Sequence, residues 1–310
     1  MPLDPYLASK LHLMENMNFH QMDEDMIARM TEFYQDSEPW RLPASLDIVD
    51  ASIPGPHGPV PYRRYVPESP TGTALVWAHG GGFATGDLDM LEAHLVAAEL
   101  AVRAQAIVFS VDYRLAQNDV RYPVPVDDVH AVLIAALQGE VETPKPLSKV
   151  AIGGASAGAA LALAAALRAK SDGAPAVSAI LLAYPLAHFP SPGLSTEISA
   201  ELAVLPESLR IPAGNVEWMV QNYLGRITCV PADAIPGAAQ LAGLPPVSVV
   251  AAEYDDLRAS AELLDRQLEA SAVPVRFYLA AGMVHGYLNR STSLSEVVKS
   301  LDFFAEALNG

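Results

Sequence analysis

The sequence has a single cysteine, Cys229, among its 310 residues. One cysteine cannot form an internal disulfide bond, and without companion cysteines it does not indicate a zinc site. Proteins of reducing compartments commonly have this low cysteine content, so we expect a cytoplasmic location. We interpret Cys229 as a bystander rather than a nucleophile.

Positive charge is also scarce. The chain has 19 Lys and Arg residues against 36 Asp and Glu residues, which gives a formal net charge of -17. Nucleic acid or an anionic membrane would be repelled over most of such a surface, so we expect neither as a partner. The expected partner is a neutral or cationic small-molecule substrate.

Three further signals are missing from the sequence. No stretch of about eighteen apolar residues runs without Gly, Pro or charge, and the first residues lack the regions of a signal peptide, so no membrane insertion is expected. The histidines do not show metal-ligand spacing, so no metal is expected. The glycine-rich stretches lack the spacing of a dinucleotide or phosphate loop, so no cofactor is expected.

The sequence does contain a regular alternation of apolar runs and helical stretches. The apolar runs, which predict strands buried on both faces, are residues 73–79, 106–112, 150–153, 177–184, 247–252 and 275–280. Helical patterns lie between them at residues 89–104, 126–138 and 257–271, after Ser156 and at the C-terminus. Residues 46–66 predict two antiparallel strands around a proline-glycine turn. This order predicts an α/β fold in a single domain of residues 1–310.

Two segments fall outside this alternation. Residues 1 to about 38 have apolar residues at helical spacing and predict a helix. Residues 186–225 contain several prolines and a predicted helix over 215–223. Ligands of parallel sheets bind beyond the carboxyl ends of the strands. We therefore expect residues 1–45 and 186–225 to form a cap over that edge of the sheet.

The alternation is organised around residues 150–160, which read V-A-I-G-G-A-S-A-G-A-A. Within them, Gly154-Ala155-Ser156-Ala157-Gly158 fits G-x-S-x-G, the strand-turn-helix elbow that exposes a nucleophilic serine. Glycine at both flanks has a physical reason, because the strand and the helix come so close that a Cβ atom would collide. The alternative interpretation is ordinary close packing of a helix on a sheet.

A serine hydroxyl is a weak nucleophile at neutral pH, so the elbow needs a base, an acid and donors for an oxyanion. Residues 79–82 read H-G-G-G after a predicted strand, and this type of loop provides oxyanion donors together with the N–H group after the serine, here Ala157. The acidic segment 253–256 and His285 follow two later predicted strands. The order Ser156, acid, His285 is the order of an α/β-hydrolase.

Several motifs make the resemblance more specific. They are H-G-G-G-F with Gly86 and Asp87 following, V-D-Y-R-L-A at residues 111–116, Y-P-V-P-V-D-D at 122–128, G-G-A-S-A-G at 153–158, Y-D-D-L-R at 254–258 and H-G-Y at 285–287. Together they resemble the hormone-sensitive-lipase branch of the α/β-hydrolases, the bacterial esterase family similar to arylacetamide deacetylase. The resemblance covers about residue 73 to the C-terminus. It implies a mostly parallel eight-stranded sheet with a helical cap.

The resemblance also assigns the residues of the site. It implies Ser156 as the nucleophile and His285 as the base, and alignment with the family's Asp-Pro-Leu motif selects Asp255 over Asp256 as the acid. The implied oxyanion donors are the N–H groups of Gly81, Gly82 and Ala157.

The chain departs from the family's pattern at a few positions. Ala155 stands where the family usually has an acidic residue, and Ala159 stands where it has glycine. Gln117 and Asn118 replace the common Pro-Glu after Y-R-L-A. None of these changes removes a catalytic group, but we expect Ala155 to alter the polar support beneath the elbow and the rate.

The function implied is a serine carboxylesterase that hydrolyses short-chain acyl or aryl esters through an acyl-enzyme intermediate. An amidase or deacetylase of aryl amides needs the same triad and is the second interpretation. The third is a non-catalytic small-molecule-binding homologue, but such homologues typically lack the histidine that His285 supplies. The family often dimerises through the edge strand, here residues 275–280, so a homodimer is a further expectation. The predicted pocket residues, for which plain packing is the alternative, are Phe83, Tyr184, Trp218 and Tyr287.

Overall fold

Eight strands form one sheet in the computed structural model, which describes residues 2–18 and 21–310. The strands are β1 Leu46–Ile53, β2 Val60–Pro67, β3 Thr73–Ala78, β4 Ile107–Val111, β5 Lys149–Ala155, β6 Ile180–Ala183, β7 Val247–Tyr254 and β8 Val275–Val284. Their order across the sheet is β1-β2-β4-β3-β5-β6-β7-β8. Strand β2 pairs antiparallel with β1 and β4, and the other neighbours pair parallel. The predicted mostly parallel eight-stranded sheet is therefore confirmed.

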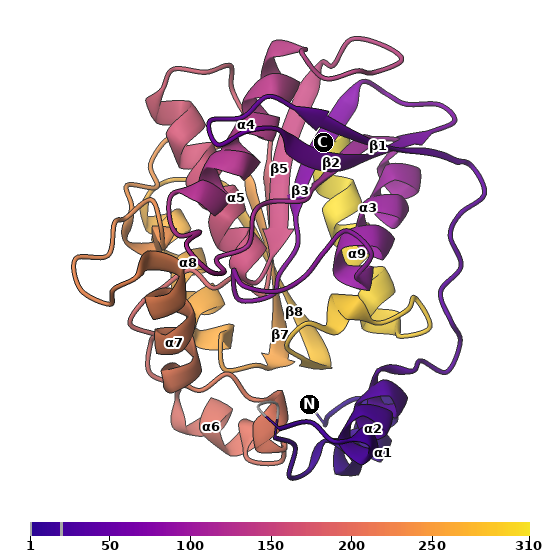
Figure 1. Cartoon of the computed structure of the whole chain (residues 1–310), viewed down its shortest axis with the longest axis vertical. Coiled ribbons are helices and arrows are strands. Elements are labelled where there is room, and N and C mark those ends of the chain that lie inside the picture. Colours follow the sequence, from indigo (N-terminus) through magenta and orange to yellow (C-terminus); the bar gives the residue numbers. More distant parts are fainter. Residues whose placement is uncertain (1, 19–20) are drawn as a thin grey trace.

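Helices cover both faces of the sheet because its central strands are apolar on both sides. The helices are α3 Leu91–Ala104, α4 Val124–Gln138, α5 Ala157–Ser171, α8 Arg258–Ala270 and α9 Ser295–Asn309. Helices α4, α5 and α8 pack on one face and α3 and α9 on the other (Figure 1). Neighbouring residues of β3 serve opposite cores, since Val76 packs with the first group and Trp77 with the second. No helix within the described residues has both the length and the apolar character needed to cross a membrane.

The N-terminal segment forms two helices where one was predicted over residues 1–38. Helix α1 spans Pro5–Lys10 and continues as a 3₁₀ turn over Leu11–Met14, and α2 spans Glu24–Tyr34. The prediction was wrong because Asp23 caps a separate helix: its side chain accepts a hydrogen bond from the N–H of Met26 at 2.8 Å. Met1, Phe19 and His20 belong to the predicted helix but lie outside the described residues.

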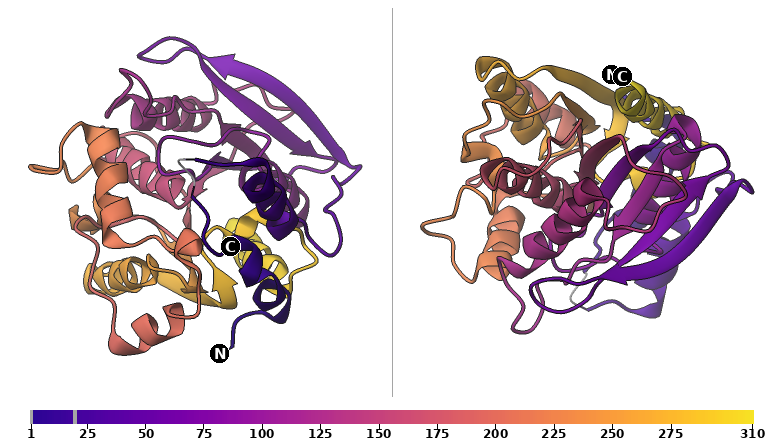
Figure 2. Two further views of the ribbon diagram at one scale, coloured as in Figure 1. Left: turned by 60° about the horizontal axis from the view of Figure 1, so that its bottom comes forward. Right: turned by 90° about the horizontal axis from the view of Figure 1, so that it is seen from above.

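The second predicted insertion, residues 186–225, interrupts the alternation between β6 and β7. It contains α6 Thr196–Leu202, which was not predicted, and α7 Ala213–Leu224, which includes the predicted helix 215–223. Figures 1 and 2 show α6 and α7 on one side of the carboxyl ends of β7 and β8 and the N-terminal helices on the other. Between them, residues 15–18 and 206–208 line a hollow of about 530 Å³.

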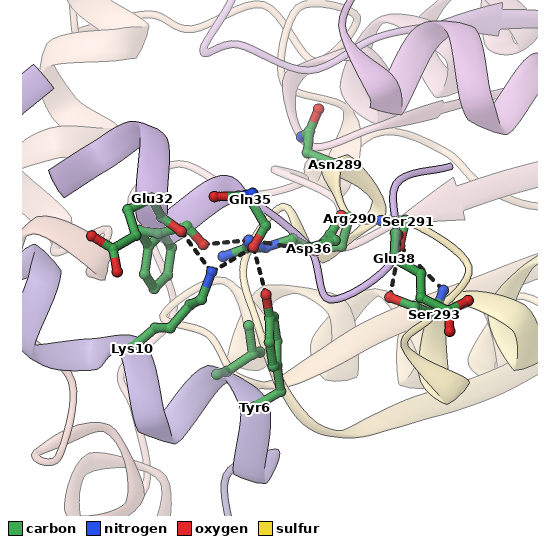
Figure 3. Close-up of polar contacts among 12 residues, drawn as sticks. Tyr6, Lys10, Glu32, Gln35, Asp36, Glu38, Asn289, Arg290, Ser291 and Ser293 are labelled. Carbon is green, nitrogen blue, oxygen red and sulfur yellow. Dashed lines mark hydrogen bonds and ion pairs between the residues drawn. The ribbon is translucent and has the colours of Figure 1, made fainter. Parts of the chain in front are cut away.

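The N-terminal helices are anchored by the loop that follows β8 (Figure 3). Arg290 is only 2% exposed, and its Nη1 donates a hydrogen bond to the carbonyl of Phe33 at 2.5 Å. The same nitrogen lies 3.6 Å from Oδ1 of Asp36, and the guanidinium lies over the rings of Phe33 and Tyr34. The N–H of Ser291 also donates to Asp36 at 2.5 Å. The end of α2 is therefore held by a buried ion pair on a loop far along the chain.

Candidate active site

Ser156 occupies a sharp turn between β5 and α5. Its φ is +54° and its ψ is −115°, a backbone conformation that a residue with a side chain rarely adopts. A Cβ atom on Gly158 would lie 2.2 Å from the carbonyl oxygens of Ala78 and His79, and one on Gly154 would lie 2.5 Å from the backbone of Gly158. The expectation that close contact of strand and helix requires both flanking glycines is confirmed.

Three side chains from successive loops meet at this turn. Nε2 of His285 lies 3.0 Å from Oγ of Ser156, and Nδ1 of His285 lies 2.7 Å from Oδ2 of Asp255. Asp255 follows the last residue of β7, and His285 follows the last residue of β8. Because the strands are parallel, their carboxyl ends share one edge of the sheet with the end of β5. This arrangement has the distances of a serine, base and acid relay.

The two adjacent aspartates after β7 have separate partners. Oδ1 of Asp255 accepts the N–H of Leu257 at 2.9 Å, which orients its other oxygen toward the histidine. Asp256 instead forms a two-pronged ion pair with Arg210, at 2.7 and 2.8 Å, and accepts the N–H of Ile211 at 2.7 Å. Asp255 is thus the carboxylate in contact with the imidazole, and Asp256 holds the segment between α6 and α7 against β7.

The electrostatic surroundings favour a charged imidazole. Burial by itself lowers the pKa of His285, but the charge and hydrogen bond of Asp255 outweigh it, with smaller contributions from Glu92 and Asp256, so the pKa is raised above its ordinary 6.5. A base with a raised pKa holds the proton taken from a serine more firmly. It also needs a higher pH to be free of that proton beforehand.

The glycine loop runs directly beside the serine. A Cβ atom on Gly80 would lie 3.2 Å from Cβ of Ser156. Gly81 has a φ of +108°, and a Cβ there would lie 2.0 Å from the carbonyl oxygen of Thr85, so only glycine fits this turn. Among the described residues, no protein acceptor takes the N–H groups of the predicted donors, which are Gly81, Gly82 and Ala157. These groups are available to a bound oxyanion.

Two of the predicted pocket residues are buried beside the histidine. The ring of Tyr184 packs edge-on against His285, with centroids 4.9 Å apart, and contacts the ring of Tyr287 at 5.6 Å. Both tyrosines are nearly inaccessible to solvent, and the hydroxyl of Tyr287 lies 2.5 Å from that of Ser300. The structure thus places Tyr184 against the imidazole and Tyr287 behind Tyr184.

Of the other two predicted pocket residues, Phe83 packs against α7 and Trp218 belongs to it. Phe83 is buried and stacks on Tyr223, with ring centroids 4.1 Å apart. Trp218 is 61% exposed. Its neighbour Met219 packs against the glycine loop instead, because a Cβ atom built on Gly82 would lie 3.2 Å from the Met219 side chain. Sequence reasoning missed Met219. The signal was present, because it shares a helical face with the buried positions Val216, Val220 and Tyr223.

Two other reactive side chains, His79 and Cys229, lie outside this relay. His79 is buried and stacked on Tyr113, and its Nδ1 lies 2.7 Å from the carbonyl oxygen of Gly80. Cys229 is exposed. Within the part of the chain that the structure describes, no three His, Cys, Asp or Glu side chains cluster in a way that could hold a metal ion.

Comparison with known proteins agrees with this geometry. A family model described as an alpha/beta hydrolase fold matches residues 75–289. The chain belongs to the α/β-hydrolase family. Among the relatives of this α/β-hydrolase, Esterase LipI of Mycobacterium tuberculosis is 32% identical, over 92% of this chain and 88% of that protein. Carboxylic ester hydrolase LipN of the same organism is 31% identical, over 86% of this chain and 72% of that protein.

Solved structures show the same relationship. An esterase from Pyrobaculum calidifontis superimposes on this α/β-hydrolase with a TM-score of 0.77 at 28% identity, over 99% of this chain and 98% of that one. A thermostable esterase from Pseudomonas putida gives a TM-score of 0.80 at 25% identity, over 99% and 97% of the two chains. The predicted family and the predicted class, a carboxylic ester hydrolase, are confirmed.

Proposed function

We propose that this α/β-hydrolase cleaves short-chain acyl or aryl esters through a Ser156-His285-Asp255 triad and an acyl-enzyme intermediate. The observation that carries the proposal is the pair of contacts at His285, 3.0 Å to the serine hydroxyl and 2.7 Å to the carboxylate. One ring nitrogen can take the serine proton while the other donates its hydrogen to Asp255.

In the first half of the reaction, Oγ of Ser156 attacks the ester carbonyl carbon and Nε2 of His285 takes the hydroxyl proton. The carbonyl oxygen becomes an oxyanion, which accepts hydrogen bonds from the N–H groups of Gly81, Gly82 and Ala157. The tetrahedral intermediate then collapses, the bond to the alcohol oxygen breaks, and His285 gives its proton to the leaving alkoxide.

In the second half, water replaces the alcohol. His285 removes a proton from the water as it attacks the acyl carbon, and the same N–H groups stabilise the second oxyanion. Collapse of this intermediate returns the proton to Oγ of Ser156 and releases the carboxylic acid. Asp255 stabilises the imidazolium in both halves.

Short acyl groups are proposed because the surroundings of the nucleophile are enclosed. Ser156 is only 7% exposed. Met219 of α7 approaches the oxyanion loop, the name used from here for the glycine loop of residues 80–82. We propose that residues 1–45 and 186–225 act as the cap of a single catalytic domain. The hollow lined by residues 15–18 and 206–208 lies between these two cap segments.

Replacing the nucleophile tests the proposal directly. Ser156→Ala should abolish hydrolysis of p-nitrophenyl acetate and labelling by a fluorophosphonate, because Ala has no hydroxyl to acylate. Ser171→Ala, at the exposed C-terminal end of α5, provides a matched serine control with normal turnover. Turnover by Ser156→Ala near that of the unsubstituted enzyme would overturn the triad.

Two substrate comparisons test the specificity. Comparing hydrolysis of p-nitrophenyl acetate with that of 4-nitroacetanilide separates an esterase from an amidase. A series of p-nitrophenyl esters from acetate to decanoate measures the preferred length of the acyl chain.

Location and assembly are proposed on narrower grounds. The lone cysteine suits the cytoplasm, where a disulfide would not persist. The edge strand β8 leaves Phe277 and Tyr278 partly exposed, which suits pairing with a second copy. Sedimentation of the purified protein measures this, and a monomer at micromolar concentration would contradict the homodimer.

A further inference from the structure

Glu92, in the first turn of α3, is a buried carboxylate that the mechanism above does not use. It is only 2% exposed, although Glu is rarely buried so completely without partners. Both of its oxygens accept hydrogen bonds from groups of the active site.

One oxygen of Glu92 holds the oxyanion loop. Oε1 accepts the N–H of Gly80 at 2.6 Å, and Gly80 directly precedes the predicted donors Gly81 and Gly82. A Cβ built on Gly80 would lie 2.5 Å from this same oxygen, so the loop fits closely against the carboxylate. The main chain that carries the donors is therefore tied to α3.

The other oxygen holds the surroundings of the histidine. Oε2 accepts the hydroxyl of Tyr184, whose ring packs against His285. It also lies 3.4 Å from the side-chain nitrogen of Asn289, and Oδ1 of Asn289 accepts the N–H of Glu92 at 3.1 Å. Asn289 is on the loop after His285, and Figure 3 shows its side chain turned away from the cluster around Arg290.

We propose that Glu92 is a positioning residue, which clamps the oxyanion loop and the histidine loop to each other through Gly80, Tyr184 and Asn289. The inference rests on the proposed triad. Ala155, next to the nucleophile, has no polar side chain with which to hold these loops. An error of about 1 Å in such a geometry costs on the order of a hundredfold in rate.

The electrostatics agree with this placement. Burial and the carboxylate of Glu92 raise the pKa of Tyr184 far above its ordinary value, so its hydroxyl stays protonated and donates. The charged and titratable groups around His285 are Asp255 and Asp256 after β7, Glu92 on α3 and Tyr184 after β6. Glu92 is among those that raise the pKa of His285. Loss of its charge should therefore lower that pKa.

The test compares two substitutions at position 92. Glu92→Gln keeps the shape but replaces one acceptor oxygen by an amide nitrogen, so it cannot accept from both partners. It should lower kcat for p-nitrophenyl acetate about ten- to a hundredfold with KM within about threefold, and move the acid limb of the pH profile to lower pH. Glu92→Asp keeps the charge but is one methylene shorter, so kcat should fall while the acid limb stays in place.

Glu99→Gln is the matched control. Glu99 lies two turns further along α3 and accepts hydrogen bonds from Trp40 at 2.8 Å and Arg103 at 3.0 Å, away from the site. Its kcat and acid limb should stay as in the unsubstituted enzyme. If Glu92→Gln does not fold, Glu92→Asp and Tyr184→Phe provide the test, since each removes part of the same clamp.

Two results would overturn the clamp. One is Glu92→Gln, or the substitute variants, with unchanged kcat and acid limb. The other is an equal loss in Glu99→Gln, which would indicate general damage to α3. Ser156→Ala is measured alongside. If Ser156→Ala is inactive while the Glu92 variants behave as the unsubstituted enzyme, only the clamp fails, whereas activity in Ser156→Ala would remove the triad itself.

Discussion

At the scale of single residues, the proposed triad makes His285 the group that sets the pH at which the enzyme works. Its pKa is raised above 6.5 mainly because Asp255 outweighs the effect of burial. Below that pKa the imidazole is protonated and cannot take the serine proton, so activity is lost as the pH falls through it. We expect the acid limb of kcat/KM for p-nitrophenyl acetate to lie above 6.5.

A pH profile of kcat/KM between about pH 4 and 10 measures this limb. Asp256→Asn is the control, because Asp256 is occupied by Arg210 and contributes less to the pKa of His285 than Asp255 does. The acid limb of the Asp256→Asn variant should move only slightly to lower pH. A limb at or below 6.5 in the unsubstituted enzyme would contradict the raised pKa.

The residues of the proposed triad could be singled out from the sequence because each belongs to a short local motif at the end of a predicted strand. Ser156 and His285 follow from the motifs alone, and in the structure Nε2 of His285 lies 3.0 Å from Oγ of Ser156. The choice between Asp255 and Asp256 depended on alignment, since neighbouring carboxylates differ only in their partners. The proposed role of Glu92 was out of reach, because its partners lie up to 197 residues away.

At the scale of elements, the rotation of α7 decides which side chain reaches the site. Adjacent helical residues point about 100° apart, so Met219 faces Gly82 while Trp218 faces solvent. Met219→Ala should open space beside the oxyanion loop. We expect it to raise the ratio of kcat/KM for the octanoate over the acetate p-nitrophenyl ester about tenfold. If Trp218 lines the pocket as the sequence suggested, Trp218→Ala will show the larger change in this ratio.

The docking of α2 depends on Arg290. Removing one partner of a buried ion pair leaves an uncompensated charge, here Asp36, whose side chain is 5% exposed. Arg290→Met should destabilise the protein by roughly 3–5 kcal/mol, measured by urea unfolding, and make the N-terminal helices sensitive to limited proteolysis.

Arg276 offers a matched control for Arg290. It also pairs with a carboxylate, Glu306 at 2.7 Å, and lies over an aromatic ring, that of Phe303, but its side chain is 48% exposed. Arg276→Met should cost less than about 1 kcal/mol, because solvent screens exposed pairs. Equal losses for the two variants would mean that α2 does not depend on the buried pair.

Strands were easier to predict than the helices near the site. Runs such as residues 73–79 are apolar throughout because both faces of β3 are buried, and this pattern is unmistakable. Helix α6 has only seven residues, too few for a clear periodicity. The break before α2 was missed, although Asp23 marked the new helix.

At the scale of the whole molecule, the net charge of -17 should select among substrates. An ester with a terminal carboxylate is repelled from such a surface, and salt screens that repulsion. Raising NaCl from about 10 mM to about 0.5 M should lower KM for p-nitrophenyl hemisuccinate several-fold. KM for the neutral p-nitrophenyl acetate should not change. An equal response of both esters would show that the site does not sense the overall charge.

The fold class could be predicted from the alternation of strands and helices, but the way the two outer segments meet the body could not. Their contacts, such as Arg290 with Phe33, join residues with no local relationship in the sequence. Polar contacts of this kind produce no periodic pattern in the sequence. Only the folded chain brings them together.

That anchor has a consequence for how the protein comes into being. Phe33 and Arg290 are 257 positions apart, so a ribosome makes α2 long before it makes the loop that holds it. The N-terminal helices must therefore wait, undocked, until nearly the whole chain has emerged. The same late stretch carries His285. The N-terminal helices can dock, and the proposed base of the triad can reach Ser156, only when synthesis of the chain is almost complete.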